Sequence, residues 1–322
     1  MRFIKGFFIL GRLGMAPLTI SVPIFAGYCS SSGTPWWNFF FLGLIGLCAH
    51  IFGFGLNDII DNPIDQTVAY RHKHPLTTGE IKQRDAWLFI LVQPVIAVGI
   101  YKFILHGSLS GILVLIGSIF LSVIYNLWSK TGKFPKFIAE FSLALSIGLL
   151  GVAGSLEIDH MRMNGMAVTF SVCTALILLL LNSVPSGLKD LKTDFNYGAT
   201  SFVISGGYSI AGENEIIPSR NIKIYSWVLE FFIGCVLMGM ILTEKSPAVL
   251  VLITIVLFVY SCLHLALILR MRFYNTLLVS MPLLSGVYNY LALCFLAIPK
   301  FPIVVRLGII GLGVQNPEQA AQ

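Results

Sequence analysis

The chain has 322 residues, of which 56% are hydrophobic and only 11% are charged. A soluble domain carries about 25% charged residues, so this composition excludes an ordinary soluble fold. The net charge of +6 at pH 7 does not indicate a nucleic acid partner, because the basic residues stand in short segments beside apolar runs. That placement is typical of membrane orientation signals.

Nine apolar runs follow one another along the chain, each near the ~20 residues that cross a bilayer. They cover residues 13–29, 36–56, 86–105, 109–128, 137–156, 165–185, 224–242, 247–269 and 276–297. The pattern predicts an all-α integral membrane protein, with residues 1–322 forming a single transmembrane domain of nine helices. A shorter apolar segment, Phe301 to Val314, is expected to lie in the membrane interface, and a polar tail begins at about residue 315.

The distribution of Lys and Arg predicts which side of the membrane each loop faces. The other side of the membrane, which includes the C-terminal segment, is predicted to hold five of the 21 basic residues, namely Lys102, Arg162, Lys245, Lys300 and Arg306. The remaining residues stand at the N-terminus and after the even-numbered runs. We therefore expect a cytoplasmic N-terminus and a C-terminus on the opposite side.

The stretch from Asn57 to Asp65 reads N-D-I-I-D-N-P-I-D and directly follows the second run. A helix would place Asp58, Asp61 and Asp65 on one face, because they are spaced i, i+3 and i+7. Pro63 removes a backbone donor, so it predicts a kink or a restart of that helix. Carboxylates at the mouth of a membrane helix are costly unless a cation pairs with them, which makes these three aspartates candidate metal ligands.

A second acidic cluster follows the sixth run, where Asp190 and Asp194 are spaced i and i+4 beside Lys189 and Lys192. Both clusters fall on the predicted cytoplasmic face. Mg²⁺ takes one or two protein carboxylates and fills its octahedron with water and phosphate oxygens, while nearby lysines neutralise a departing phosphate group. Set at the end of an apolar bundle, this pattern indicates a lipid-soluble diphosphate as substrate and Mg²⁺ as cofactor.

These motifs resemble the signatures of the UbiA-type intramembrane prenyltransferases, and the resemblance covers nearly the whole chain. Asn57 to Asp65 matches the pattern N-D-x-x-D-x-x-x-D, and His74 to Ile81 is similar to the family's Arg-Pro-Leu-x-x-Gly stretch. The second signature, D-x-x-x-D followed by a glycine and a Thr or Ser, is matched by Asp190, Asp194, Gly198 and Thr200.

The resemblance implies nine helices around a central cavity that opens towards the lipid. It also implies Mg²⁺-dependent transfer of an isoprenyl chain from its diphosphate, through an allylic carbocation, to an acceptor, for which we favour an aromatic compound. The implied metal ligands are Asp58, Asp61, Asp65, Asp190 and Asp194. The implied diphosphate-binding residues are Asn57, Arg71, Lys73, Lys189 and Lys192, and the implied catalytic residues are Lys189, Tyr125 and Lys130.

The chain departs from the family pattern at several positions. His74 stands where the family usually has Arg, Phe195 where a basic residue is common, and Asn182 and Ser186 where the second motif often extends upstream as Y-x-x-x-K. These departures keep open a terpene cyclase or a phosphoribosyl or lipid-phosphate transferase of the same fold. A transporter or lipid carrier is disfavoured, because the ionisable residues gather at one face rather than along a path across the bilayer.

Two glutamates, Glu140 and Glu230, lie inside or near the ends of predicted spans. An acid within a membrane span is a functional candidate in its own right. A bacterial inner membrane and a eukaryotic organelle membrane both suit this composition.

Overall fold

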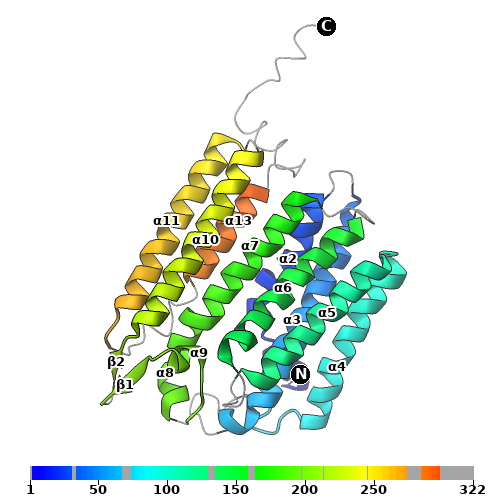
Figure 1. The fold of residues 1–322 in the computed structure, drawn as a ribbon. Helices are drawn as coiled ribbons and strands as arrows, with labels where there is room; N and C mark the ends of the chain where they lie inside the picture. Colours follow the sequence, from blue (N-terminus) through cyan, green and yellow to red (C-terminus); the bar gives the residue numbers. More distant parts are fainter. Residues whose placement is uncertain are drawn as a thin grey trace, which may run out of the picture.

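In a computed structural model, the protein is a bundle of helices that run alongside one another (Figure 1). The structure describes residues 2–30, 34–66, 74–129, 135–158, 164–196, 198–212, 214–244, 246–273 and 284–297. The predicted site residues Arg71, Lys73 and Lys130 lie outside the described residues, as do the Phe301 to Val314 segment and the polar tail.

Helices of the described residues overlap each of the nine apolar runs, although the first part of the last run, residues 276–283, lies outside the described residues. The elements up to the end of the first acidic motif are α1 (Arg2–Leu10), η1 (Leu13–Met15), α2 (Ala16–Ser30) and α3 (Trp36–Asp65). Those between the two motifs are α4 (Gln83–Gly99), η3 (Ile100–Ile104), α5 (Leu109–Trp128), α6 (Lys136–Ile158) and α7 (Gly165–Leu181). The rest are η4 (Asn182–Ser186), α8 (Gly187–Asn196), α9 (Phe202–Ser205), β1 (Ser209–Ala211), β2 (Glu215–Ile217), α10 (Arg220–Glu244), α11 (Ala248–Arg270) and α13 (Leu284–Ala297).

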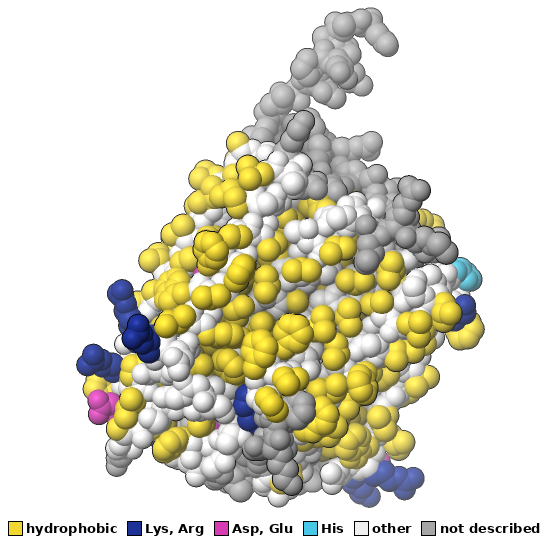
Figure 2. Space-filling model, viewed as in Figure 1, with side chains coloured by type: hydrophobic (Ala, Val, Ile, Leu, Met, Phe, Trp, Pro, Cys, Tyr) yellow, Lys and Arg dark blue, Asp and Glu magenta, His cyan; other side chains and the backbone are white. Residues whose placement is uncertain are grey.

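Seven of the described helices are long and apolar enough to cross a membrane, and α2 and α13 are shorter apolar helices. Large apolar side chains are exposed along the outward faces of α4, α5, α10 and α11, among them Phe120, Phe231 and Leu252. Figure 2 shows apolar side chains over the middle of one face, with basic side chains at its margins. Lipid accommodates such a surface at no cost, so the protein is an integral membrane protein. The count of nine crossings stays a prediction.

Small residues let the central helices approach closely, as is common in membrane bundles. A Cβ added at Gly46 would lie 2.8 Å from the Cα of Ile20, and one at Gly154 would lie 2.4 Å from the carbonyl oxygen of Pro23. Both contacts involve α2, which therefore lies against α3 on one side and α6 on the other. This packing fixes the end of α3 relative to its neighbours.

One expectation about the polar segments is corrected, and one unpredicted feature is found. The helix α3 neither ends nor restarts at Pro63, because Pro63 is two residues before its end and the bond from the Gln66 N–H to the Asn62 oxygen, 3.0 Å long, still closes the last turn. The long segment after the sixth run carries the two short strands, β1 and β2. It contains an antiparallel hairpin that pairs Ile210 with Ile216, and Gly212 in its turn has a φ of +59°, which glycine adopts without strain.

Candidate functional site

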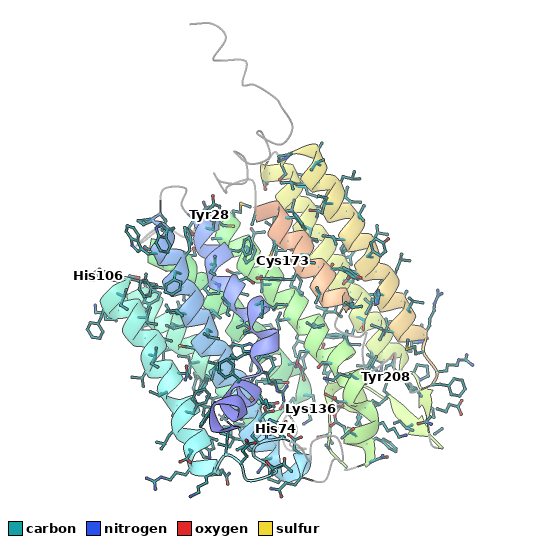
Figure 3. All side chains as sticks on the ribbon, turned by 180° about the vertical axis from the view of Figure 1, so that it is seen from behind. Tyr28, His74, His106, Lys136, Cys173 and Tyr208 are labelled. Carbon is teal, nitrogen blue, oxygen red and sulfur yellow. The ribbon has the colours of Figure 1, made fainter. Side chains whose placement is uncertain are left out.

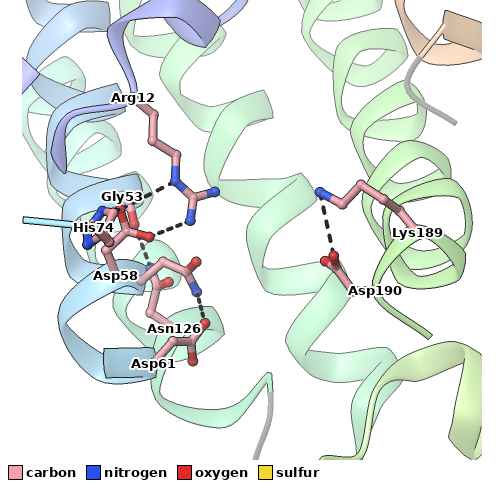
Figure 4. A network of polar contacts seen from close by, with 9 residues as sticks. Arg12, Gly53, Asp58, Asp61, His74, Asn126, Lys189 and Asp190 are labelled. Carbon is pink, nitrogen blue, oxygen red and sulfur yellow. Dashed lines mark hydrogen bonds and ion pairs between the residues drawn. The ribbon is translucent and has the colours of Figure 1, made fainter. Parts of the chain in front are cut away.

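The two acidic motifs lie at the same end of the bundle (Figures 1 and 4). The first occupies the last turns of α3, and the second occupies α8. The hydroxyl of Tyr125, on α5, is within electrostatic range of both Asp61 and Asp190. The site is therefore assembled from segments more than a hundred residues apart in the sequence.

The three aspartates of the first motif are all buried, with Asp58 1% exposed, Asp61 4% and Asp65 7%. Because α3 is helical through Asp65, their spacing places them on one face, as predicted. The guanidinium of Arg12 is within electrostatic range of all three. Asn57 donates from Nδ2 to Oδ2 of Asp61 over 3.0 Å, one helical turn away, and so orients that carboxylate.

Arg12 is the cation that the sequence analysis missed. Its Nη2 forms an ion pair with Oδ1 of Asp58, and its Nε donates to Oδ2 of the same carboxylate over 3.4 Å. The guanidinium also lies 5.3 Å from the centre of the Phe54 ring, a cation–π contact. Figure 4 shows Arg12 reaching Asp58 from the opposite side to His74, whose Nε2 lies 3.3 Å from Oδ2 of Asp58.

The backbone at Arg12 explains how this side chain reaches α3. Arg12 has φ 43° and ψ 43°, a left-handed conformation that costs a non-glycine residue about 1 kcal/mol. This residue turns the chain between α1 and η1. Sequence reasoning counted Arg12 only as an orientation signal, although a lone arginine just before an apolar run was the available clue.

Electrostatics keep Arg12 charged. Burial by itself lowers the pKa of the guanidinium, but the carboxylate of Asp58, with further contributions from Asp65 and Asp61, raises it by more. The pKa of Arg12 therefore lies above its ordinary value. A permanently charged guanidinium beside three carboxylates is suited to hold an anion that arrives with a metal ion.

The second motif is more open. Asp194 is buried, whereas Asp190 is partly exposed and has the ammonium of Lys189 at 3.7 Å from its Oδ1. In Figure 4 Lys189 extends from α8 towards the side of the site that carries Arg12. The ammonium of Lys192 instead donates to Oδ1 of Asn214 over 2.6 Å, in an exposed contact with the turn of the hairpin. That contact gives no support to the predicted diphosphate role of Lys192.

Between the two motifs lies a group of polar side chains from α5, α6 and η4. Asn182 donates from Nδ2 to the Tyr125 hydroxyl over 2.9 Å and to Oε2 of Glu140 over 2.5 Å. Lys136, one turn before Glu140, donates to the carbonyl of Ser129 over 2.9 Å and is within electrostatic range of Glu140 and Asp194. Lys136 and His74 lie at the same end of the bundle in Figure 3. Lys136 was not among the predicted site residues.

The described residues contain no group of three or more His, Cys, Asp or Glu side chains placed to hold a metal ion. The donor chemistry nevertheless suits Mg²⁺, because all five predicted ligands are carboxylates and Mg²⁺ takes one or two of them before substrate oxygens and water complete its octahedron. Buried carboxylates on two facing segments therefore fit a cation shared with a phosphate group better than a cation bound by protein alone.

Comparison with known proteins identifies the family of this chain. The pattern of the UbiA prenyltransferase family matches residues 20–269. A protoheme IX farnesyltransferase from Aliivibrio salmonicida (strain LFI1238) is 28% identical over 115 residues, which are 34% of this chain. The match spans 39% of that relative's length.

Solved structures share the fold over nearly the whole chain. A digeranylgeranylglyceryl phosphate synthase structure has a TM-score of 0.64 and 18% identity, covering 93% of this chain and 99% of that one. A UbiA homologue from Archaeoglobus fulgidus bound to GPP and Mg²⁺ has a TM-score of 0.63 and 14% identity, covering 92% and 99%. One from Aeropyrum pernix K1 has a TM-score of 0.62 and 15% identity, covering 90% and 98%. With the family pattern matched from residue 20 to residue 269, the chain belongs to the UbiA prenyltransferase family.

Proposed function

We propose that the protein transfers an isoprenyl chain from an isoprenyl diphosphate to an aromatic acceptor within the membrane, with Mg²⁺ as cofactor. One observation carries the proposal: two carboxylate motifs meet at one end of an apolar bundle, and Tyr125 is within electrostatic range of both. The apolar bundle suits an isoprenyl tail, and the motif end suits its diphosphate.

The comparisons support the substrate class. The Archaeoglobus fulgidus homologue was solved with DMAPP or GPP together with Mg²⁺, and the curated relative is a farnesyltransferase. For this chain we propose the cytoplasmic side of the membrane as the location of both motifs, on the basis of the Lys and Arg distribution. The central cavity open to the lipid belongs to the same proposal.

The residues of the two motifs have distinct roles in the proposed site. Asp58, Asp61 and Asp65 would hold Mg²⁺ from α3, and Asp190 and Asp194 would hold it from α8. When bound, Mg²⁺ would neutralise diphosphate oxygens and so favour departure of the leaving group. Asn57 keeps the Asp61 carboxylate in place through its hydrogen bond.

Cations of the chain bind the diphosphate in this proposal. Arg12 offers a forked donor and Lys189 a point charge, from opposite sides of the site. Arg71, Lys73 and Lys130 are proposed partners from outside the described residues. Arg12 is paired with Asp58, so its guanidinium would have to exchange that carboxylate for diphosphate oxygens when the substrate binds.

The transfer itself requires few protein groups. The allylic C–O bond breaks and its electron pair leaves with the diphosphate. A nucleophilic carbon of the acceptor then forms a bond to the allylic carbon and releases a proton, which restores the aromatic ring. The apolar walls exclude water, which would otherwise capture the carbocation.

The decisive experiment is mass spectrometry of lipid extracts after purified protein is incubated with geranylgeranyl diphosphate, Mg²⁺ and a panel of acceptors. An acceptor whose mass rises by one geranylgeranyl group is the expected result. Diphosphate release with an acceptor-free terpene as the product would instead establish a cyclase and overturn the transfer.

Three variants test the site. D61N and D190N are each expected to abolish Mg²⁺-dependent turnover, because each removes a charge that binds the metal. E80Q changes an exposed acid near the first motif and should leave turnover unchanged. Full activity in D61N or D190N, with all three proteins folded, would refute the metal assignment.

A further inference from the structure

The carboxylate of Glu140 has no part in the proposed metal site, yet it is buried next to it. Glu140 is 7% exposed and accepts a 2.5 Å hydrogen bond from Nδ2 of Asn182. Burying a carboxylate in a membrane bundle is costly. A glutamine could offer Asn182 the same acceptor at a lower desolvation cost, so packing alone does not explain the acid.

With Glu140 as a carboxylate, the hydrogen bonds around Asn182 have only one consistent direction. The amide nitrogen carries two hydrogens, and both are used, one by Glu140 and one by the hydroxyl of Tyr125 at 2.9 Å. A carboxylate accepts and does not donate, so turning the amide would set its oxygen against the carboxylate of Glu140. The charge of Glu140 therefore fixes the nitrogen of Asn182 towards Tyr125.

This direction determines what the Tyr125 hydroxyl can do. Its oxygen accepts from Asn182, so its own hydrogen is left to donate. In the part of the chain that the structure describes, no acceptor is recorded for that hydrogen. The hydroxyl is within electrostatic range of Asp61 and Asp190, where the proposed diphosphate would present several acceptor oxygens.

The backbone at Asn182 also sets this group apart from an ordinary helix contact. Asn182 begins the π-helical segment η4, which contains Pro185. Pro185 has no N–H to bond within an α-helix, and the wider turn absorbs that loss. Single π turns within helices occur often at functional sites, and this one places Asn182 between Glu140 of α6 and Tyr125 of α5.

We infer that Glu140 and Asn182 are positioning residues, which act through Tyr125 by making its hydroxyl a hydrogen-bond donor to the diphosphate of the isoprenyl substrate. The inference rests on the proposed function. It adds to the proposed site a polar contact with the diphosphate that lies outside the aspartate motifs. It also gives a role to Asn182, which stands where many family members have a tyrosine.

A double-mutant cycle tests the inference through kcat/KM for the isoprenyl diphosphate. Y125F, N182L and E140L should each lower kcat/KM about tenfold, which is the loss expected for one hydrogen bond to a charged group. The double variants Y125F/N182L and Y125F/E140L should be no worse than Y125F, because the hydroxyl is then already missing. E140Q should recover part of the E140L loss, since the amide oxygen still accepts from Asn182.

Binding of inorganic pyrophosphate with Mg²⁺, measured by calorimetry, gives a readout that does not depend on turnover. Its Kd should rise about tenfold in Y125F and in N182L. S142A serves as the matched control, because Ser142 is also buried and lies on α6, the helix of Glu140. It should leave both kcat/KM and this Kd unchanged. Where N182L does not fold, N182A takes its place in the cycle.

The outcomes separate this inference from the proposed function. A wild-type protein that neither binds pyrophosphate with Mg²⁺ nor consumes an isoprenyl diphosphate refutes the proposed function itself. In the other case the wild-type protein does both, but the losses from Y125F and N182L multiply in the double variant. That result leaves the proposed function standing and overturns the positioning role.

Discussion

The ion pair of Arg12 and Asp58 gives the most direct test of how the motif end is stabilised. The variant R12M removes the guanidinium but keeps an unbranched side chain on the left-handed backbone. Asp58 then remains a buried carboxylate without its main partner, since its side chain is 0% exposed. The same change removes a cation that is paired with the first motif.

The expected loss follows from the burial of the two partners. Breaking a fully buried pair by removing one partner costs about 3–5 kcal/mol. Arg12 is 24% exposed, and His74 at 3.3 Å can offset part of the charge, so we expect a loss of about 2–4 kcal/mol. For a chain of this size such a loss lowers the Tm by about 5–10 °C.

The assay is thermal unfolding of the detergent-solubilised protein, followed by intrinsic fluorescence without added Mg²⁺. R84M, an exposed arginine in the first turn of α4, is the matched control and should leave the Tm unchanged. R12M/D58N should recover much of the loss, because no unpaired charge remains. A Tm of R12M equal to that of R84M, or a double variant as unstable as the two single losses combined, would refute the reasoning.

Three further predictions address the metal, the packing and the second buried acid. Chelation with EDTA should stop pyrophosphate release and added Mg²⁺ should restore it; release that persists in EDTA would contradict the metal role. G154A should lower the Tm by several degrees, because its Cβ would meet the Pro23 backbone at 2.4 Å, whereas G239A, whose Cβ would meet nothing within 4 Å, should not. E230L should destabilise the protein by about 2–4 kcal/mol in chemical unfolding, because Ser261 and Asn289, which donate to Glu230 over 2.7 and 2.9 Å, lose their acceptor; stability equal to wild type would contradict it.

Local patterns in the sequence were sufficient for the helices and for the shared face of the three aspartates in α3. A run of apolar side chains predicts a membrane helix wherever it lies in the fold, because the bilayer acts on each segment separately. The spacing of Asp58, Asp61 and Asp65 likewise follows from helix geometry alone. The helix does not restart at Pro63, because one missing hydrogen bond near a helix end does not outweigh the helical tendency of the residues around it.

The tertiary structure decided which polar groups meet. Arg12 and Asp58 are 46 residues apart, and Asn182 and Tyr125 are 57 apart, so no periodicity along the chain relates them. Their contacts depend on the close packing of α2 against α3 and α6, on the left-handed turn at Arg12 and on the π turn at Asn182. A buried charge takes its partner from whichever helix packs beside it, and that neighbour is set by the shapes of apolar surfaces summed over the whole bundle.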